Sequence, residues 1–314
     1  MAMVTEKQAD AWQVSKLRRW RAFVLLCAAA LALSLIWTRP LLTQQPGGWD
    51  KIIERMEKEG CTALESGVKV CRADYAVNGK AVEAISFVPA GEGRFPGVLM
   101  VPGYERTARD FVPLGIRFAK QGLAGIAVSQ PGFGKSKGPP DFVGPKTVEV
   151  LKVAYQTLKQ QPYVDPNRMA IYGYSRGGMA ASLLATELDD VKAAVFGAGI
   201  YDFQLFYNDT PLPGARRNML DETGMTKQAI IERSSILRMD RLKCPVLILH
   251  GERDENVPVS QAKALRDRLT QLHKEFEIKL FPDAPHSIGA PAGDAAVDFF
   301  RRKLQEKSGL SQKN

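Results

Sequence analysis

The chain has 314 residues, of which 45% are hydrophobic and 25% are charged, a composition that is typical of globular proteins and sufficient for one large core. Its net charge of +9 is concentrated at the ends, because residues 1–21 carry +3 and residues 301–314 carry +4, which leaves +2 for residues 22–300. This near-neutral middle predicts no nucleic-acid partner. With three histidines and no CxxC pair among four cysteines, we also expect no metal ion and no cofactor.

The N-terminal segment combines a basic flank with an apolar run. Residues 16–21 read KLRRWR, and residues 22–37 carry no charge. As a helix this run would be about 24 Å long, slightly short of a hydrocarbon core of ~30 Å but workable with snorkelling arginines. Since basic flanks stay in the cytoplasm, we expect a cytoplasmic N-terminus at 1–21 and one transmembrane helix at 22–38. The remainder of the chain would lie outside the cytoplasm.

A cleaved signal peptide is the alternative for this segment. Signal peptides share the order of a basic flank and an apolar run, but they end in a small-x-small cleavage site. Here the run ends in SLIWT, without such a site, which favours an uncleaved anchor over secretion.

Residues 39–67 are expected to form a linker and a short helix at 49–60 that ends at a glycine. Cys61 and Cys71 lie close together in the sequence. They could form a disulfide in an oxidising compartment or remain two reduced cysteines, and the sequence leaves both possibilities open.

From residue 68 to 307 the pattern predicts one domain, followed by a tail at 308–314. Two β-type runs at 68–77 and 81–89 flank Asn78-Gly79, a strong hairpin signal. Short buried-type runs then alternate with helical patterns, which predicts an α/β fold with a doubly wound, mostly parallel sheet after an antiparallel N-terminal hairpin. The expected strands are 97–101, 124–129, 169–174, 193–196, 245–250 and 277–281, and the expected helices are 110–121, 147–160, 177–188, 260–274 and 292–306.

One connection, the insert at 200–243, is too long for a simple turn. A connection of this length is typical of an active-site cover. Catalytic groups of such a sheet are expected on loops at the carboxyl ends of its strands.

The sequence Gly173-Tyr174-Ser175-Arg176-Gly177 lies directly between a predicted strand and a predicted helix. A G-x-S-x-G motif in this context is typical of a nucleophile elbow, in which the glycines make room for a strained serine. We therefore predict that Ser175 is a nucleophile, the alternative being a serine that caps a helix in a glycine-rich turn.

A nucleophilic serine needs a histidine base, and three histidines are available. His273 lies on a predicted helix, and His250 closes a predicted strand, where a structural hydrogen bond is the simpler role. His286 follows the last predicted strand, in a loop from which a base could reach the serine. We predict that His286 is the base.

The base needs a carboxylate partner. The sequence at 250–258, HGERDENVP, follows a buried strand, and within it Asp254 falls in the turn before the next helix. Asp202 is the rival, and Asp283 is disfavoured because it lies so close to His286 in the sequence. The order Ser175, Asp254, His286 is the order of the nucleophile-elbow hydrolases.

Three motifs carry a resemblance: the elbow at 173–178, the H-G-x-x-D-x-x-V-P pattern at 250–258 and the A-P-H at 284–286. Residues 95–305 resemble the alpha/beta-hydrolase superfamily, and most of all prolyl oligopeptidase-type serine peptidases and dienelactone-hydrolase-like esterases. The resemblance supports Asp254 over Asp202. It also implies an oxyanion hole made by the backbone N–H of Arg176 and by Tyr104, through either its N–H or its hydroxyl.

These residues predict a serine hydrolase that cleaves a carboxylic ester or an amide through an acyl-enzyme on Ser175. Oligopeptidases of the resembling type carry a large propeller domain, whereas only residues 39–67 separate the apolar segment from the first hairpin here. This difference favours an esterase on small or medium acyl substrates. The alternatives are an oligopeptidase-like or aminoacyl peptidase, and a non-catalytic, membrane-tethered homologue that binds a ligand.

Overall fold

The computed structural model describes residues 48–304, and a compact unit begins at Gly48. The predicted cytoplasmic N-terminus at 1–21, the predicted membrane segment at 22–38 and the tail at 308–314 lie outside these residues. Within residues 48–304, no helix is long and apolar enough to cross a membrane.

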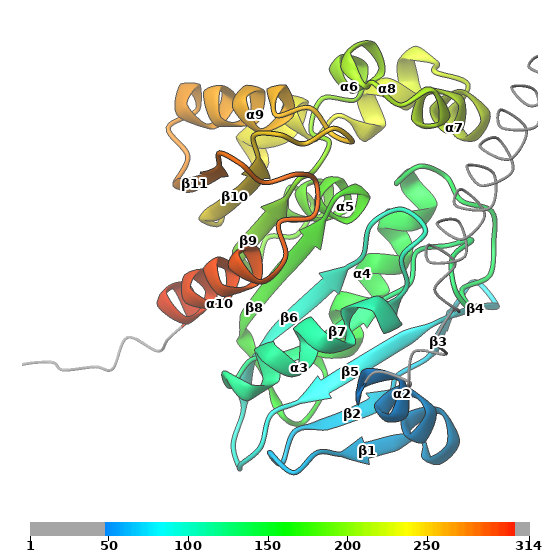
Figure 1. The fold of residues 1–314 in the computed structure, drawn as a ribbon, viewed down its shortest axis with the longest axis vertical. Coiled ribbons are helices and arrows are strands. Elements are labelled where there is room, and N and C mark those ends of the chain that lie inside the picture. Colours follow the sequence, from blue (N-terminus) through cyan, green and yellow to red (C-terminus); the bar gives the residue numbers. More distant parts are fainter. Residues whose placement is uncertain (1–47, 305–314) are drawn as a thin grey trace, which may run out of the picture. The chain divides into compact units, whose positions relative to one another are not determined.

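In the described chain, nine strands form one sheet in the order β1-β2-β5-β7-β6-β8-β9-β10-β11 (Figure 1). The six strands from β7 to β11 in this order are parallel to one another, and β5, β2 and β1 continue the sheet in antiparallel fashion. The predicted α/β fold with a mostly parallel sheet is confirmed. The strands are β1 (Cys61–Ala63), β2 (Lys69–Arg72), β5 (Ala84–Val88), β6 (Phe95–Val101), β7 (Ala124–Val128), β8 (Val164–Tyr174), β9 (Val191–Gly197), β10 (Val246–Gly251) and β11 (Phe276–Phe281).

The predicted N-terminal hairpin is present around Asn78 and Gly79, but its long arms are divided. β3 (Tyr75–Val77) and β4 (Lys80–Val82) form a separate two-stranded sheet, while β2 and β5 pair within the main sheet. At the break, the Asp74 carboxylate accepts a hydrogen bond from the backbone N–H of Ala84 at 3.0 Å and thereby replaces a regular ladder bond. A side chain therefore ends the ladder at a point that strand periodicity does not reveal.

The sheet also extends further toward the N-terminus than the sequence predicted. β1 pairs with β2, Cys61 lies opposite Cys71, and the two cysteines form a disulfide. α2 (Gly48–Glu59) precedes β1 and buries Met56 against the same core as β2 and β5. The segment after residue 47 is thus part of the folded unit.

Helices cover both faces of the sheet, and each face has its own apolar core. α2, α3 (Val112–Lys120) and α10 (Ala290–Leu304) pack on one face, with Phe118, Phe299 and Phe300 among the buried side chains. α4 (Pro145–Lys159), α5 (Arg176–Ala185) and α9 (Ser260–Gln271) pack on the other. In Figure 1, α3 and α10 lie in front of the sheet and α4 lies behind it. This is the doubly wound arrangement that the alternating pattern predicted.

The insert forms α6 (Phe203–Asp209), α7 (Pro213–Thr223), α8 (Lys227–Arg233) and the 3-10 helix η2 (Ser235–Arg241). Of these, α6, α7 and α8 lie beyond the carboxyl ends of the parallel strands (Figure 1). Buried polar contacts fix the insert to the domain: the Arg233 guanidinium donates to the Asp141 carbonyl at 2.7 Å, and Ser182 Oγ lies 2.8 Å from Ser235 Oγ. The insert is therefore anchored over the end of the sheet at which ligands of α/β folds bind.

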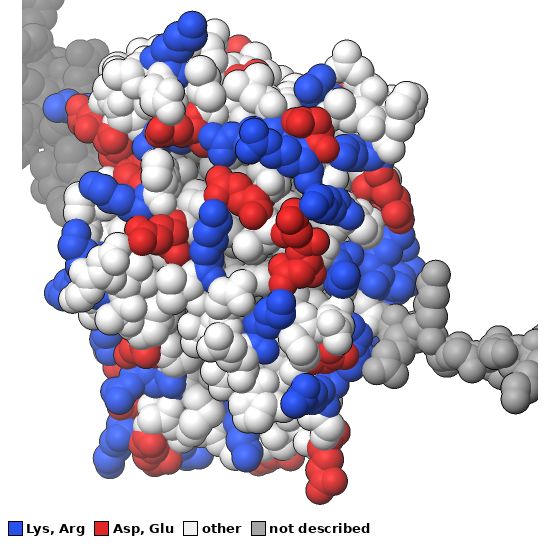
Figure 2. All heavy atoms as spheres, turned by 180° about the vertical axis from the view of Figure 1, so that it is seen from behind, with Lys and Arg blue, Asp and Glu red and all other residues white. Residues whose placement is uncertain are grey.

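Surface charge on the face opposite the view of Figure 1 is mixed. Acidic side chains lie next to basic ones over this face (Figure 2). The arrangement agrees with the net charge of +2 for residues 22–300 and gives this face little long-range field of one sign.

Candidate active site

Ser175 lies at the sharp turn between β8 and α5. Its backbone angles, φ 58° and ψ −126°, fall in a region of the Ramachandran plot that residues other than glycine rarely occupy. A Cβ atom at position 173 would lie 2.0 Å from the Gly177 carbonyl oxygen, and one at position 177 would lie 1.9 Å from the Val101 carbonyl oxygen. Both neighbours must therefore be glycine, which is the geometry of a nucleophile elbow.

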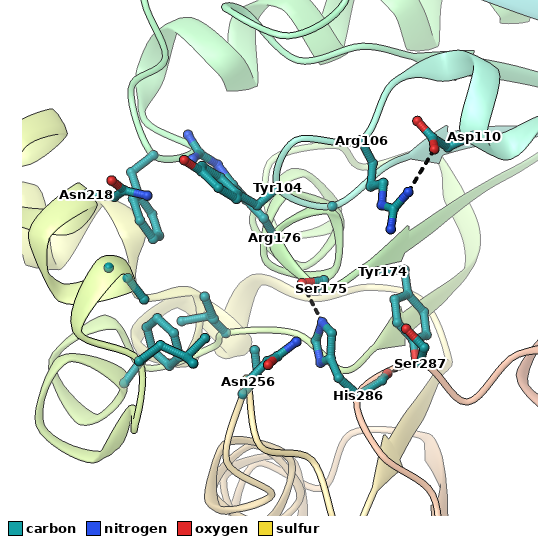
Figure 3. Close-up of a pocket in the computed structure, with 18 of the residues that line it drawn as sticks. Tyr104, Arg106, Asp110, Tyr174, Ser175, Arg176, Asn218, Asn256, His286 and Ser287 are labelled. Carbon is teal, nitrogen blue, oxygen red and sulfur yellow. Dashed lines mark hydrogen bonds and ion pairs between the residues drawn. The ribbon is translucent and has the colours of Figure 1, made fainter. Parts of the chain in front are cut away.

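His286 lies in the loop between β11 and α10, at the same end of the sheet as Ser175. Its Nε2 lies 2.9 Å from Ser175 Oγ (Figure 3), and its Nδ1 lies 2.7 Å from Asp254 Oδ2. The three predicted residues are thus brought together from the ends of β8, β10 and β11 in a chain of two hydrogen bonds.

Asp254 follows β10, and its side chain is fully buried. Oδ1 accepts hydrogen bonds from the backbone N–H groups of Asn256 and Val257, each at 2.9 Å, while Oδ2 faces His286 and lies 3.3 Å from Nε2 of His250. Burial raises the pKa of the Asp254 carboxyl, but the hydrogen bonds from His250, His286 and the Val257 amide outweigh burial and hold this pKa well below its ordinary value. The residue is a carboxylate at neutral pH.

The other candidates have different partners. His250 Nε2–H donates to the Val257 carbonyl at 2.9 Å, and His273 lies just past Leu272, the C-cap of α9. Asp202 caps α6 by accepting from the Leu205 N–H at 2.9 Å. Asp283 pairs with Arg253 at 2.7 Å on the surface. In the described structure none of these four residues forms a hydrogen bond or ion pair with Ser175, whereas His286 and Asp254 form a connected chain with it.

The two predicted oxyanion residues flank Ser175. The backbone N–H of Arg176 opens α5, where the helix dipole favours negative charge. A Cβ atom at Gly103 would lie 3.1 Å from that of Ser175, so the chain just before Tyr104 passes beside the nucleophile. The Tyr104 ring points away from Ser175 toward Asn218 (Figure 3). The Tyr104 hydroxyl is therefore directed away from the nucleophile.

The side chain of Arg176 has a role that the sequence did not indicate. Its guanidinium is almost fully buried, donates to the Glu222 carboxylate of α7 at 2.8 and 3.3 Å and stacks 4.6 Å from the Phe142 ring. The Glu222 carboxylate also accepts a hydrogen bond from the backbone N–H of Phe142 at 2.6 Å. The pair joins α7 of the insert to the residue after the nucleophile. No local sequence signal marks Glu222, because its partner lies 46 positions away in the chain.

A pocket of about 900 Å³ opens above Ser175 and His286, a size that suits a small-molecule ligand. Its charged lining residues are compensated, because Arg106 pairs with Asp110 at 3.1 Å and Arg176 pairs with Glu222. Its apolar wall comes mainly from the insert and neighbouring loops: Phe142, Ile200, Phe206, Leu212, Ala215 and Val257. Within residues 48–304, no group of three or more His, Cys, Asp or Glu side chains could hold a metal ion.

The fold and the comparisons with known families define the protein as a serine hydrolase of the alpha/beta-hydrolase superfamily. Residues 144–305 match the prolyl oligopeptidase family, and residues 52–216 match the FrsA-like esterases. The chain belongs to the prolyl oligopeptidase family.

Among its relatives is the uncharacterized peptidase YtmA of Bacillus subtilis, 30% identical over 237 residues that cover 74% of this chain and 91% of YtmA. Dipeptidyl-peptidase 5 of Porphyromonas endodontalis is 29% identical over 51% of this chain, but the match spans only 24% of that enzyme.

A puromycin-hydrolyzing peptidase of Mycobacterium tuberculosis has a similar structure, with a TM-score of 0.66 and 25% identity over 74% of this chain and 39% of that one. The hydrolase of 2,6-dihydroxy-pseudo-oxynicotine has a TM-score of 0.65 at 20% identity, over 80% of this chain and 72% of that one, and shows the shared fold alone.

Proposed function

We propose that the protein hydrolyses a carboxylic ester through an acyl-enzyme on Ser175, with His286 as general base and acid and Asp254 as its partner. The observation that carries this proposal is the pair of hydrogen bonds that joins Ser175 Oγ, the two ring nitrogens of His286 and the Asp254 carboxylate. It is the geometry that an activated serine requires.

In the proposed reaction, Ser175 Oγ attacks the carbonyl carbon while His286 Nε2 accepts the hydroxyl proton. The ionised Asp254 accepts the Nδ1–H bond and stabilises the imidazolium. The backbone N–H groups of Arg176 and Tyr104 donate to the oxyanion, each worth about 3 kcal/mol. His286 then returns the proton to the leaving alcohol, and a water molecule deprotonated by the same nitrogen releases the acid and regenerates Ser175.

The substrate that fits best is a neutral, small or medium acyl ester. The apolar wall of the pocket suits an uncharged acyl group, and the charged lining residues already have partners, so a charged substrate would have to displace an existing ion pair. The match of residues 52–216 to the FrsA-like esterases supports the same choice.

Peptide hydrolysis is the second candidate. The prolyl oligopeptidase match at 144–305 and the 30% identity to a relative named as a peptidase favour it. The same residues would act in the same order, with an amine in place of the alcohol as the leaving group.

Three measurements test these proposals. Ser175→Ala should reduce turnover of p-nitrophenyl esters to background, a loss of about 10⁵-fold or more, and should abolish labelling by a fluorophosphonate probe. Unlabelled wild-type protein would support a non-catalytic binding protein instead. The values of kcat/KM for short-chain esters and for aminoacyl p-nitroanilides then separate the two substrate classes, and a higher value for the anilides would overturn the choice of ester.

We also propose that the catalytic domain faces the outside of the cytoplasmic membrane. The basic flank before the apolar run at 22–37 and the Cys61–Cys71 disulfide support this orientation, because disulfides persist in oxidising compartments. A C-terminal alkaline phosphatase fusion should be active and a C-terminal GFP fusion dark. The reverse pattern would refute the orientation.

A further inference from the structure

The hydroxyl of Tyr174 forms two hydrogen bonds to the backbone of the loop that carries the base, at His286 and at Ile288. It donates to the carbonyl oxygen of His286 at 2.5 Å and accepts the N–H of Ile288 at 3.2 Å. The Tyr174 ring also packs edge-on against the His286 imidazole, with 5.9 Å between ring centroids and 62° between ring planes. Figure 3 shows Tyr174 beside His286 and Ser287. One side chain therefore fixes the loop segment that carries the base.

Tyr174 is itself held firmly, because it is the last residue of β8 and directly precedes Ser175. In the sheet it pairs with Gly197 of β9, and a Cβ atom at position 197 would lie 2.5 Å from the Tyr174 ring. The ring therefore occupies the space that a side chain at position 197 would take. Burial raises the pKa of Tyr174 to about 12, so the hydroxyl keeps its proton and remains a donor at neutral pH.

We propose that Tyr174 is a positioning residue that holds the His286 loop in register with the nucleophile elbow, and this inference rests on the proposed function of Ser175 and His286. The Tyr174 side chain, immediately before Ser175, is hydrogen-bonded to the main chain of His286. Ser175 and His286 therefore move as one unit. Proton transfer requires a distance of about 2.6–3.2 Å between heavy atoms, and the observed distance from Ser175 Oγ to His286 Nε2 is 2.9 Å. Freeing the loop would spread this distance over a wider range.

The test is Tyr174→Phe, which removes the hydroxyl and keeps the ring. Loss of the two hydrogen bonds should lower kcat for a p-nitrophenyl ester about tenfold, leave KM within about twofold and slow fluorophosphonate labelling of Ser175 by the same factor as kcat. The matched control is Tyr75→Phe, whose hydroxyl donates to the Val150 carbonyl at 2.9 Å outside the pocket. This control should lower the melting temperature but leave kcat and KM unchanged.

A second variant displaces the same ring by a steric clash. The Cβ atom of Gly197→Ala would collide with the Tyr174 ring and move it, so this variant should lower kcat in the same way, without removing the hydroxyl. Because both substitutions act through one contact, the double variant should be no slower than the slower single variant. Circular dichroism and melting curves establish that each protein is folded at the assay temperature.

Three results would overturn the proposal. The first is a folded Tyr174→Phe protein with wild-type kcat, and the second is a raised KM at unchanged kcat, which would make Tyr174 a substrate contact. The third is that the effects of Tyr174→Phe and Gly197→Ala on kcat multiply fully in the double variant. Failure of the proposed function is distinguishable, since it would appear as full activity of Ser175→Ala or as a wild-type protein that the fluorophosphonate does not label.

Discussion

Replacement of Asp254 by asparagine tests the assignment of the acid, and the structure predicts how the new side chain must lie. Oδ1 accepts two backbone N–H groups, from Asn256 and Val257. The amide oxygen of an asparagine must take this position, so its NH₂ group faces Nδ1 of His286. Nδ1 must then accept a hydrogen bond, and the ring proton moves to Nε2, the nitrogen that faces Ser175 Oγ. A protonated Nε2 cannot accept the serine proton.

The expected loss in kcat for Asp254→Asn is about 10⁴-fold, which corresponds to about 5.5 kcal/mol of barrier. Initial rates on a p-nitrophenyl ester at neutral pH measure it. The matched control is Asp202→Asn: Asp202 caps α6, and asparagine caps helices equally well, so kcat should stay within about twofold of the wild-type value. A loss of less than about tenfold in Asp254→Asn, or a large loss in Asp202→Asn, would refute the assignment.

Three further substitutions and conditions probe the site. Because the pKa of Asp254 is depressed in the folded protein, the stability that its carboxylate contributes is complete above the ordinary pKa of about 4 and is lost as the pH falls through the folded-state pKa. The difference in melting temperature between wild type and Asp254→Asn should therefore shrink in acid. A difference that grows in acid would contradict this reasoning. Glu222→Ala leaves the buried Arg176 without its counter-ion and should cost about 3 kcal/mol of unfolding free energy in urea titrations; unchanged stability would show that the pair contributes nothing. Gly251→Ala places a Cβ atom 2.3 Å from the Ala284 carbonyl oxygen, so kcat should fall as the His286 loop moves, and wild-type kcat would argue that the loop tolerates displacement.

The sequence predicted the parallel part of the fold well because these elements carry strong local signals. Fully buried strands such as β7 and β10 appear as short apolar runs, and helices such as α4 bury one clear face. The antiparallel edge was predicted less well. β1 has three residues and only one of them is buried, and the division of the hairpin depends on the Asp74 carboxylate, whose bond to Ala84 exists only in the folded chain.

The residues predicted as a triad could be found because each has a local context. Ser175 has a motif between a strand and a helix, His286 follows from elimination among three histidines, and Asp254 lies in a turn after a buried strand. The contacts around them could not be found in this way. Glu222 meets Arg176 across 46 positions of the chain, and the Tyr174 hydroxyl meets the His286 carbonyl across 112. Such pairs follow from the tertiary arrangement of loops, which has no periodicity to detect.

Main-chain contacts hold the His286 loop on both sides of the base. On one side of the loop, the Arg253 N–H donates to the Ala284 carbonyl at 3.1 Å, and on the other the Tyr174 hydroxyl bonds the His286 carbonyl. The Nε2 contact to Ser175 Oγ is a single hydrogen bond to a half-buried hydroxyl. Removing that hydroxyl in Ser175→Ala should therefore leave the imidazole in place, whereas Tyr174→Phe should displace it although Ser175 is intact. Crystal structures of the two variants would show which contact holds the His286 imidazole. A displaced imidazole in Ser175→Ala would mean that the serine, and not the loop, holds the base.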